Sequence, residues 1–448
     1  MHGYRSSSAR RQRAWPHLLT VAALLALTGS CTPTSRLEPP PQQVVAPDTT
    51  MPRVDAIRGE PIVRVRVGQA QQRVTLTGER DADRLVIAPG PASRQARSFP
   101  GPVQITRDGD RFVLRAGNGH RYAWAVPRLR ITRQDGDTLR LDGDRVYPGA
   151  IVLVATRGEG DAQFDIVNHV QMERYLPGVL ERELYGSWRP ATFQAQAIAA
   201  RSYAFFEMAA NRDRHFDMHD SSASQVYGGL SEHAPSLAAV RRTRGEVVVH
   251  ANRVVPAFYS SCCGGLTQSA RTAFPGRAPV VDVPSLAGGV QCTSCDASPN
   301  HRWDAIHRSR DDTARRIAAW GAANGHSVAG LRGLVQVRAL VGSVPGRPGG
   351  FELVDQRGTR FRVPPEALRA ACNHEAEDLP PLPRDQQLRS SHVRVQVAGG
   401  RVSFTQGRGF GHGVGLCQWG AQGLAERGRS AHQIVQHYYP GATIRAAY

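Results

Sequence analysis

Short stretches of alternating apolar and polar residues constrain the N-terminal part of this chain most strongly. Between Val54 and Val146 the sequence contains the stretches IVRVRV, QRVTLTG, RLVIAPG and TLRLDG, and Asp-Gly and Pro-Gly pairs punctuate the region. Alternation places successive side chains on opposite faces of a strand, and these dipeptides suit tight turns between strands. The sequence therefore predicts a β-rich N-terminal region over residues 53–146. Turn formers are abundant throughout, with 45 glycines and 30 prolines in 448 residues, which disfavours a helical bundle.

Helical patterns begin near residue 170 and are clearest from Pro190 to Asn211. That stretch, PATFQAQAIAARSYAFFEMAAN, is rich in alanine, begins with proline and carries apolar residues at helical spacing. Strand-like patterns return at GEVVVHANRVVPAFYSS, and the chain ends in a glycine-rich segment, GRGFGHGVGLCQWGAQG, and a short helix. We therefore expect an α+β fold that is mainly β. A β-rich N-terminal region is followed by a mixed core that contains the helices and by a Gly-rich C-terminal loop.

The N-terminus has the pattern of an export signal. Arginines between positions 5 and 13 precede ten apolar residues, Leu18 to Leu27, a length that fits a signal peptide better than a membrane-spanning helix. Small residues and then Cys31 follow, an arrangement that resembles a lipoprotein signal with Cys31 as the lipidation site. We expect a lipoprotein-type signal peptide over residues 1–31 and a Pro-rich tether over 32–52, with plain secretion as the alternative. The protein is then exported and held by a lipid anchor in the cell envelope, facing the periplasm.

The basic charge of the chain comes from arginine alone. The net charge is +18, and the 56 basic residues are all arginine because the sequence contains no lysine. Two interpretations are open, namely codon bias in a GC-rich genome and attraction to anionic partners such as wall polymers or lipopolysaccharide. The arginines are scattered and form no basic patch interleaved with aromatic residues. We therefore do not expect a nucleic-acid partner.

The cysteine count agrees with export. Seven cysteines are present, and six remain when Cys31 is set aside as the lipidated residue. An even number of cysteines in an exported chain suggests disulfides, because the compartment is oxidising. Sequence alone leaves their pairing open. The candidates for disulfides are Cys262, Cys263, Cys292, Cys295, Cys372 and Cys417.

One acidic residue stands out in the first helical segment. On a helix, Glu183 falls in the middle of the apolar arc formed by Val179, Leu180 and Leu184. A carboxylate among apolar neighbours loses hydration, so its pKa is expected to rise. A raised pKa keeps the group protonated near neutral pH, as a general acid requires. The alternative is a partly buried structural glutamate paired with an arginine such as Arg201 on the next helix.

Three long blocks in order carry a resemblance to a known family. They begin VNHVQMERYLPGVLERELYGSW, QVYGGLSEHAPSLAAVRRTRGEVVVHANRVVPAFYSSCCGGLTQS and GRGFGHGVGLCQWGAQGLAERG. These blocks resemble the family of stage II sporulation protein D and the amidase enhancer LytB. The resemblance is strong over residues 147–275 and 405–441 and weaker over 54–146 and 276–400. It implies a catalytic region over residues 147–448, in which 276–400 is a less typical inserted or accessory part.

The resemblance also implies a function. Characterised members are similar to lytic transglycosylases, which cleave peptidoglycan glycan strands already stripped of stem peptides, and their acidic residue corresponds to Glu183. Glu183 would protonate the glycosidic oxygen, and the 6-hydroxyl of the muramic acid would then attack internally to leave a 1,6-anhydro end. The alternative is a non-catalytic, peptidoglycan-binding enhancer of a cell-wall amidase. A zinc hydrolase is a third hypothesis.

Further residues of the three blocks are candidates for contacts with the glycan. The resemblance gives Glu173, the glutamate of the MExYL motif, a structural or substrate-positioning role. Small polar groups suit sugar hydroxyls, aromatic faces suit sugar rings, and glycines allow close approach of the backbone. A buried aromatic ring for Tyr259 and a tight turn for Gly264 are the open alternatives. The candidate substrate-binding residues are Glu173, Arg201, Tyr259, Ser261, Gly264, His412, Gln418 and Trp419.

The sequence gives little support for a metal at the position that the resemblance implies. Some members of the family bind zinc through one histidine and two cysteines just before a CQxY motif. Here the corresponding stretch, HFDMHDSSASQVYGG, keeps His215 and His219 but has Ser224 in place of the motif cysteine. Because the thiolates are missing, we do not expect zinc there.

A second cysteine pattern is ambiguous. Cys292 and Cys295 form the motif CTSC, with His301 nearby, and CxxC is a zinc signal when a second spaced pair joins it. Cys262 and Cys263 are adjacent rather than spaced. In an exported chain we therefore favour disulfides between these two regions over zinc, and we expect no cofactor.

Overall fold

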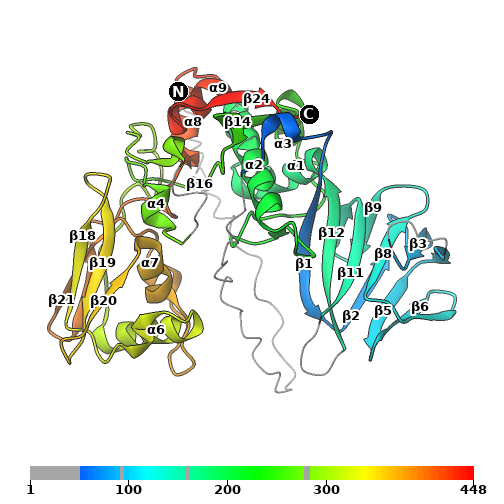
Figure 1. Cartoon of the computed structure of the whole chain (residues 1–448), viewed down its shortest axis with the longest axis horizontal. Coiled ribbons are helices and arrows are strands. Elements are labelled where there is room, and N and C mark those ends of the chain that lie inside the picture. The colour runs from blue at the N-terminus through cyan, green and yellow to red at the C-terminus, as the bar shows by residue number, and fades with distance from the viewer. Residues whose placement is uncertain (1–50, 91–94, 157–161, 277–282) are drawn as a thin grey trace, which may run out of the picture. The chain divides into compact units, whose positions relative to one another are not determined.

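The computed structural model describes residues 51–90, 95–156, 162–276 and 283–448 (Figure 1). The predicted signal peptide, Cys31 and all but the last two residues of the predicted tether lie outside the described residues. Within the described part, no helix is long and apolar enough to cross a membrane. The fold is α+β and mainly β, as the sequence predicts.

The alternating stretches of the N-terminal region form strands. These strands are β1 (Ile62–Gln71), β2 (Arg73–Thr77), β3 (Arg84–Ala88), β4 (Arg97–Pro100), β5 (Val103–Asp108), β6 (Arg111–Ala116), β7 (Arg121–Trp124), β8 (Arg128–Arg133), β9 (Thr138–Leu141), β10 (Arg145–Pro148), β11 (Ala150–Thr156), β12 (Gln163–Gln171) and, from later in the chain, β13 (Met218–His219). Burial alternates along many of them, as in β5, where Val103 and Ile105 are buried, whereas β11 and β12 are buried in continuous runs. Where the sequence alternates, the apolar residues mark the buried face of the strand.

Two sheets are built from these strands. A seven-stranded sheet has the order β13-β1-β12-β11-β8-β3-β4, and a six-stranded sheet has the order β10-β9-β2-β5-β6-β7. β1 pairs with β12 on one side and with the short β13 on the other. β1 and β12 are antiparallel, from Ile62 opposite Gln171 to Gln71 opposite Phe164. The seven-stranded sheet therefore continues past residue 147, where the sequence predicts the start of the next region.

Helices follow this sheet directly. They are α1 (Met172–Glu183), α2 (Pro190–Ala210), α3 (Ala234–Arg242), α4 (Ala270–Ala273), α8 (Gln418–Glu426) and α9 (Ala431–Tyr438). α1 begins where β12 ends, and Pro177 lies inside it. α2 is the helix predicted from Pro190, and a proline at the first position costs nothing because that N–H would have no partner. α2 is buried along most of its length, which explains why its sequence is apolar on all sides.

Two small sheets tie the end of the chain to its middle. Their strands are β14 (Glu246–His250), β15 (Arg253–Val254), β16 (Tyr259–Ser260), β23 (Leu416–Cys417) and β24 (Thr443–Ala446). β24 pairs with β14, and β23 runs parallel to β16. The Gly-rich segment therefore lies against the SSCCGG segment, and the third block of the sequence meets the second.

The glycines of these two segments allow their backbones to approach closely. Gly264 has φ +69°, and a side chain there would lie 2.8 Å from the backbone nitrogen of Gly409. Gly409 has φ +82°, and its side chain would lie 2.6 Å from the carbonyl oxygen of Cys262. Gly264 is buried and faces protein. These contacts favour the alternative of a tight turn for Gly264, because the backbone that it approaches is that of the Gly-rich segment.

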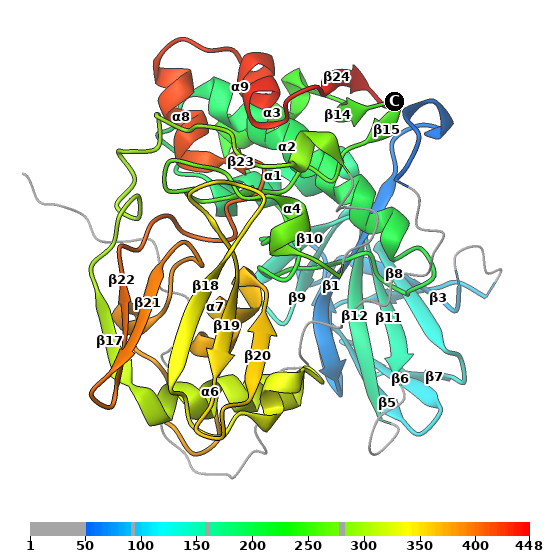
Figure 2. The same ribbon diagram turned by 60° about the vertical axis from the view of Figure 1, so that its left-hand side comes forward.

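Residues 303–404 build a second hydrophobic core of their own. Its elements are β17 (Ile306–Ser309), α6 (Arg310–Ala323), β18 (Gln336–Val341), β19 (Pro348–Val354), β20 (Arg360–Val363), α7 (Pro365–Asn373), β21 (Arg394–Ala398) and β22 (Arg401–Thr405). The short 3-10 helices of the described part are η1 (Val54–Ala56), η2 (Pro284–Leu286), η3 (Ser327–Gly330) and η4 (Arg384–Gln386). Figure 2 shows β18, β19 and β20 side by side, with α6 and α7 next to them. Phe351 and Phe404 are fully buried in this core, which matches the less typical part of the sequence.

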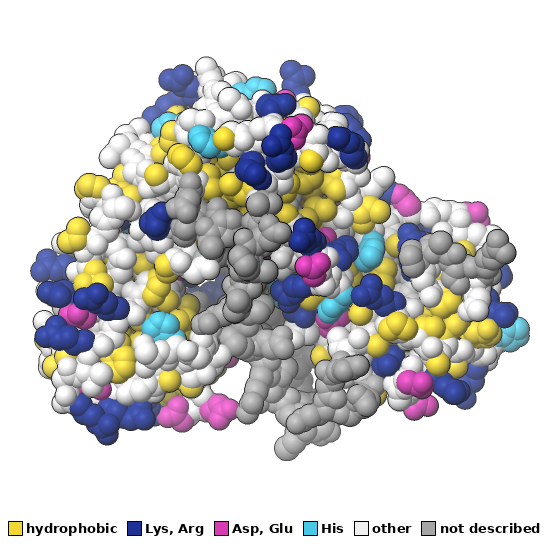
Figure 3. Space-filling model, in the orientation of Figure 1, with side chains coloured by type: hydrophobic (Ala, Val, Ile, Leu, Met, Phe, Trp, Pro, Cys, Tyr) yellow, Lys and Arg dark blue, Asp and Glu magenta, His cyan; other side chains and the backbone are white. Residues whose placement is uncertain are grey.

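Arginine side chains are spread over the molecular surface. In Figure 3 they lie over the N-terminal sheets, over the helices and over the second core on the face that is shown. This spread agrees with the scattered positions of arginine in the sequence.

Candidate active site

Glu183 lies at the point where the first and third blocks of the sequence meet. It is the last residue of α1, and its Oε2 accepts a hydrogen bond of 3.0 Å from Nε2 of Gln418, the first residue of α8. The backbone amide of Val226 also donates to the carboxylate of Glu183. The fold therefore brings together two residues that are 235 positions apart.

Burial sets the acidity of Glu183. It raises the pKa of the Glu183 carboxyl above its ordinary value of 4.5, while the hydrogen bonds from Gln418 and Val226 lower it to a smaller extent. The side chain is still partly accessible to solvent. The raised pKa that the apolar arc predicts is thus confirmed. The groups that act on Glu183 are a side-chain amide and a backbone amide, so the proton affinity of this carboxyl is not set by a second carboxylate.

Two tyrosines and a glutamine continue the polar lining beside Glu183. The hydroxyl of Tyr175 donates to Oε1 of Gln225 at 3.1 Å, and Nε2 of Gln225 donates to the hydroxyl of Tyr259 at 2.9 Å. Burial, with a further contribution from the charge of Glu183, raises the pKa of both tyrosines well above the ordinary value. Both rings therefore stay neutral. Sequence reasoning named Tyr259 but missed Tyr175 and Gln225.

Three aromatic residues that follow Glu183 or Gln418 closely in the sequence form a cluster. Tyr185, Trp188 and Trp419 pack with ring centroids 5.2, 5.7 and 5.1 Å apart. Tyr185 is 43% exposed, and the two tryptophans are partly buried. Sequence reasoning named Trp419 only. Tyr185 and Trp188 could have been found from the YGSW segment, which follows α1 closely in the sequence.

Glu173 and Arg201 do not contact Glu183. Both guanidinium nitrogens Nε and Nη2 of Arg201 donate to the Glu173 carboxylate at 2.9 Å, and Arg201 is fully buried. The hydroxyl of Tyr448 and the amide of Gly245 donate to the same carboxylate. Glu173 is ten residues from Glu183, about 15 Å along the helix. Glu173 and Arg201 therefore form a structural ion pair, which agrees with the structural role that the resemblance allows for Glu173, and the alternative in which Arg201 pairs with Glu183 is wrong.

His412 and Ser261 hold the Gly-rich segment in place. Nδ1 of His412 accepts a 3.0 Å hydrogen bond from the amide of Val414, and its ring packs edge-on against Phe258 and Phe274. Burial lowers the pKa of His412 to about 4, so the ring is neutral. The carbonyl of Ser261 accepts from the amide of Trp419 at 3.1 Å. The contacts of His412 and Ser261 are thus internal to the fold.

The residues at the zinc position that the resemblance implies make other interactions. Nε2 of His215 lies 2.8 Å from Asp165, and Nδ1 of His219 lies 3.1 Å from a guanidinium nitrogen of Arg66. The hydroxyl of Ser224 accepts from the amide of His219. Burial and the charge of Arg66 lower the pKa of His219 to about 4. The guanidinium of Arg66 beside Nδ1 of His219 would repel a metal cation, so the residues present do not suit zinc there.

The six described cysteines are buried thiols, not disulfides. Cys372 lies in the second hydrophobic core. The other five gather where the SSCCGG, CTSC and GLCQWG segments meet, as the sequence expectation of contacts between these segments implies. No disulfide joins any of the six in the structure, and four of the sulfurs converge on one point, so the pairing stays a prediction.

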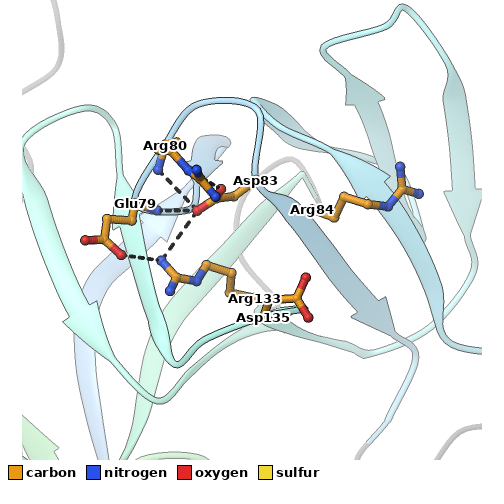
Figure 4. Close-up of a pocket in the computed structure, with 6 residues that line it drawn as sticks. All are labelled: Glu79, Arg80, Asp83, Arg84, Arg133 and Asp135. Carbon is orange, nitrogen blue, oxygen red and sulfur yellow. Dashed lines mark hydrogen bonds and ion pairs between the residues drawn. The ribbon is translucent and has the colours of Figure 1, made fainter.

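A charged pocket on the N-terminal sheets offers no chemistry of its own. Figure 4 shows its lining of acidic residues and arginines, which are Glu79, Arg80, Asp83, Arg84, Arg133 and Asp135. Arg133 donates to Glu79 at 2.9 Å, and Arg80 donates to Asp83 at 3.2 Å. Because these charges neutralise one another, Glu183 remains the better candidate for catalysis.

The comparisons with known proteins agree with the residues at this site. The family model described as Stage II sporulation protein matches residues 160–250, which include α1, α2 and Glu183. An uncharacterized protein of Brachyspira hyodysenteriae is 29% identical over 281 residues, which is 62% of this chain and 68% of that protein.

Two relatives with functional names are also similar to this chain. Stage II sporulation protein D of Bacillus amyloliquefaciens is 26% identical over 297 residues, covering 63% of this chain and 76% of that protein. The amidase enhancer of Bacillus subtilis is 25% identical over 301 residues, covering 60% of this chain but only 40% of the enhancer. This chain therefore carries a stage II sporulation protein domain over residues 160–250 and is similar to sporulation protein D and to the amidase enhancer.

Proposed function

We propose that this protein is a peptidoglycan lytic transglycosylase in which Glu183 is the single general acid and base. The observation that carries the proposal is the environment of Glu183, which has a raised pKa, partial access to solvent and only neutral hydrogen-bond partners. A group of this kind is protonated over more of the pH range than an ordinary glutamate, so it can give a proton to a leaving oxygen. The substrate is a glycan strand, which we expect to lack stem peptides.

The proposed reaction conserves its protons. Glu183 gives its proton to the glycosidic oxygen as the bond from that oxygen to C1 of the muramic acid breaks. The carboxylate then takes the proton of the 6-hydroxyl, whose oxygen bonds to C1 and closes the 1,6-anhydro ring. Glu183 ends protonated again, and no water is consumed. The N–H of Gln418 stabilises the carboxylate that exists between the two transfers.

One carboxyl group is enough for this chemistry. Retaining and inverting glycosidases place two carboxyl groups around the scissile bond, whereas the internal 6-hydroxyl replaces both the second carboxylate and the water. A well-oriented internal nucleophile reaches effective molarities of about 10⁵–10⁸ M. The neutral surroundings of Glu183, an amide side chain and two neutral tyrosines, agree with this mechanism.

The aromatic cluster Tyr185, Trp188 and Trp419 suits the same substrate. Aromatic faces pack against the apolar faces of sugar rings and offer a large contact area. Tyr185 follows Glu183 by two positions and Trp419 follows Gln418 by one, so the cluster borders the proposed acid. We assign to it the sugar ring next to the cleaved bond.

The test is product analysis on glycan strands that an amidase has stripped of stem peptides. Mass spectrometry after incubation with the wild-type protein is expected to find new 1,6-anhydro ends, and none with Glu183→Gln. Reducing ends instead of anhydro ends would identify a hydrolase and contradict the proposed chemistry. Glu173→Gln serves as the matched control, because it makes the same change on the same helix away from the site.

A second function is supported by the name of one relative, the amidase enhancer. In that case the protein binds glycan strands and stimulates a cell-wall amidase without cleaving the strands. Stimulation of an amidase by the Glu183→Gln variant, with intact strands in a wild-type incubation, would favour this function. The same residues around Glu183 would serve both functions, so binding alone does not separate them.

We also propose that the protein works at the membrane surface through a lipid anchor at Cys31. The proposal rests on the signal-like sequence of residues 1–31, and the Pro-rich residues 32–52 would act as a spacer. Incorporation of radiolabelled palmitate into the wild type but not into Cys31→Ser is the expected result. Labelling of both proteins or of neither would contradict the anchor.

A further inference from the structure

Four buried thiols meet at one point beside the candidate active site. All four sulfur atoms lie within 4.8 Å of one another. They belong to Cys263, Cys292, Cys295 and Cys417, which we call the four-thiol cluster. Three separate segments of the chain supply them, so the fold itself has to assemble the cluster. We propose that the four-thiol cluster binds one zinc ion through four thiolates.

The spacing of the sulfurs fits a tetrahedral metal. Zinc holds thiolate sulfurs at about 2.3 Å, which places neighbouring sulfurs about 3.8 Å apart in a tetrahedron. The Sγ atoms of Cys263 and Cys295 are 4.0 Å apart. Cys292 and Cys295 supply the CxxC spacing that is typical of one half of a structural zinc site. An all-sulfur tetrahedral set also favours zinc over calcium or magnesium, which prefer oxygen ligands.

Disulfides explain the same residues less well. A disulfide needs its sulfurs at about 2.05 Å, and two disulfides would separate four sulfurs that the fold brings to one point. The parity argument for disulfides also fails, because Cys372 lies in the second hydrophobic core and leaves five thiols in this region. The fifth thiol, Cys262, hydrogen-bonds the carbonyl of Cys295 and stays outside the cluster.

Hydrogen-bond donors surround the sulfurs as an outer shell. The backbone amides of Cys263 and Gly420 lie 3.3 Å from Sγ of Cys417, and the hydroxyl of Tyr438 lies 3.1 Å from Sγ of Cys292. Four thiolates around one Zn²⁺ leave a net negative charge, and N–H and O–H donors stabilise that charge in a buried site. Their convergence is therefore what a metal thiolate centre requires.

A glycine makes room for the outer shell. A side chain at Gly420 would lie 2.4 Å from Sγ of Cys292 and would also overlap the Tyr438 hydroxyl. Gly420 thus keeps the first turn of α8 against the four-thiol cluster. His301 is a rival ligand, since its Nδ1 lies 3.3 Å from Sγ of Cys295 and it groups with Cys262 and Cys295. The four thiols complete a tetrahedron without it, so we assign His301 to the outer shell.

The proposed metal is structural. Four protein ligands leave no open position for water or substrate, so the site does not support a zinc hydrolase. Cys417 is the N-cap of α8 and directly precedes Gln418, which donates to Glu183. The metal would therefore fix the start of α8 and with it the partner of Glu183. This consequence rests on the proposed function, whereas the zinc site itself does not.

The test is the zinc content of the full chain, purified without chelators and measured by elemental mass spectrometry. We expect about one zinc per chain in the wild type and at least a tenfold reduction in Cys292→Ser. Cys372→Ser is the matched control, because it removes a buried thiol outside the cluster and is expected to keep its zinc. Cys262→Ser is expected to keep it as well. Zinc-free wild-type protein, with thiols or with mapped disulfides, would overturn the proposal.

A second measurement covers the case in which Cys292→Ser does not fold. Titration of the wild type with a mercurial, in the presence of a chromogenic zinc chelator, is expected to release one zinc as about four thiols react. Cobalt substituted for zinc is expected to show sulfur-to-metal charge-transfer bands and the visible bands of a tetrahedral centre. Cobalt bands without thiolate character would overturn the ligand assignment. Zinc-loaded protein that leaves glycan strands intact would contradict the proposed function and leave the zinc site standing.

Discussion

Two glutamates of helix α1, Glu173 near its N-terminal end and Glu183 at its C-terminal end, have opposite surroundings. At the N-terminal end, Glu173 holds two hydrogen bonds from the buried guanidinium of Arg201 and a third from Tyr448. At the C-terminal end, Glu183 has only amide partners, is partly exposed and has a raised pKa. The same side chain thus belongs to a buried ion pair at one end and has a raised pKa at the other. The residues that surround each glutamate therefore decide its role, since the residue type and the helix are the same.

The cause of the difference is the position of α1 between two parts of the fold. Its first turn follows β12 directly and packs under the C-terminal residue Tyr448, so Glu173 is enclosed. Its last turn faces the start of α8, whose glutamine donates a hydrogen bond without compensating charge.

The largest expected effect on stability comes from breaking the ion pair at the N-terminal end. Arg201→Met leaves the Glu173 carboxylate buried without its cation, which costs about 3–5 kcal/mol in the free energy of unfolding. Urea unfolding measures this loss. The double variant Glu173→Leu with Arg201→Met is expected to recover much of it, because no unpaired charge then remains. A single variant as stable as the wild type would contradict the structural role of the pair.

The next effect comes from removing the amide donor at the C-terminal end. In Gln418→Ala the carboxylate form of Glu183 loses a stabilising hydrogen bond, so the pKa of Glu183 rises further. The alkaline limb of the pH–rate profile is expected to move to higher pH, and the maximal rate to fall on the order of tenfold. Gln433→Ala on α9 is the matched control, since its hydrogen bonds are with Ser430. A limb that moves to lower pH would contradict the assignment of the acid.

A smaller effect is expected at the aromatic cluster. Trp419→Ala and Tyr185→Ala each remove a contact worth about 1 kcal/mol to a bound sugar, which raises KM about fivefold and leaves kcat nearly unchanged. Steady-state kinetics on glycan strands measures both constants. Trp320→Ala, on α6 in the second core, is the control and is expected to leave KM unchanged. An effect confined to kcat would show that the cluster does not bind the ground-state substrate.

The smallest effect is on the stability of the Glu183 variant. Because the pKa of Glu183 in the folded protein lies above its ordinary 4.5, the folded state binds more protons, and stability falls as pH rises through that window. Glu183→Gln removes this dependence. The variant is therefore expected to melt slightly above the wild type at pH 7, and the difference is expected to vanish near pH 4. A lower melting temperature for the variant at pH 7 would argue that Glu183 is a paired, structural anion.

The sequence predicts elements that depend on local periodicity. The alternation of Val103 and Ile105 with polar residues marks a strand, and the alanine-rich pattern from Pro190 marks α2, because each pattern reports the face of a single element. The apolar arc around Glu183 likewise predicts its raised pKa. These features need no knowledge of the partner elements.

Contacts between distant segments are not readable from periodicity. The ion pair of Glu173 with Arg201 depends on how α1 crosses α2, so sequence reasoning placed both residues with the substrate. The count of cysteines suggested disulfides because it included Cys372, which belongs to another core. Gln418 was named only through the family resemblance, and the fold then supplied its contact with Glu183.

The most direct test of the central claim is the rate at which 1,6-anhydro ends appear with Glu183→Gln and with Glu173→Gln on the same stem-peptide-free strands. Both proteins are measured at a temperature at which circular dichroism shows them folded. If Glu183 is the general acid and base, Glu183→Gln lowers the rate about 10²–10⁴-fold, whereas Glu173→Gln stays within about tenfold of the wild type. Equal losses in the two variants, or a Glu183→Gln protein that forms anhydro ends at the wild-type rate, would contradict this role.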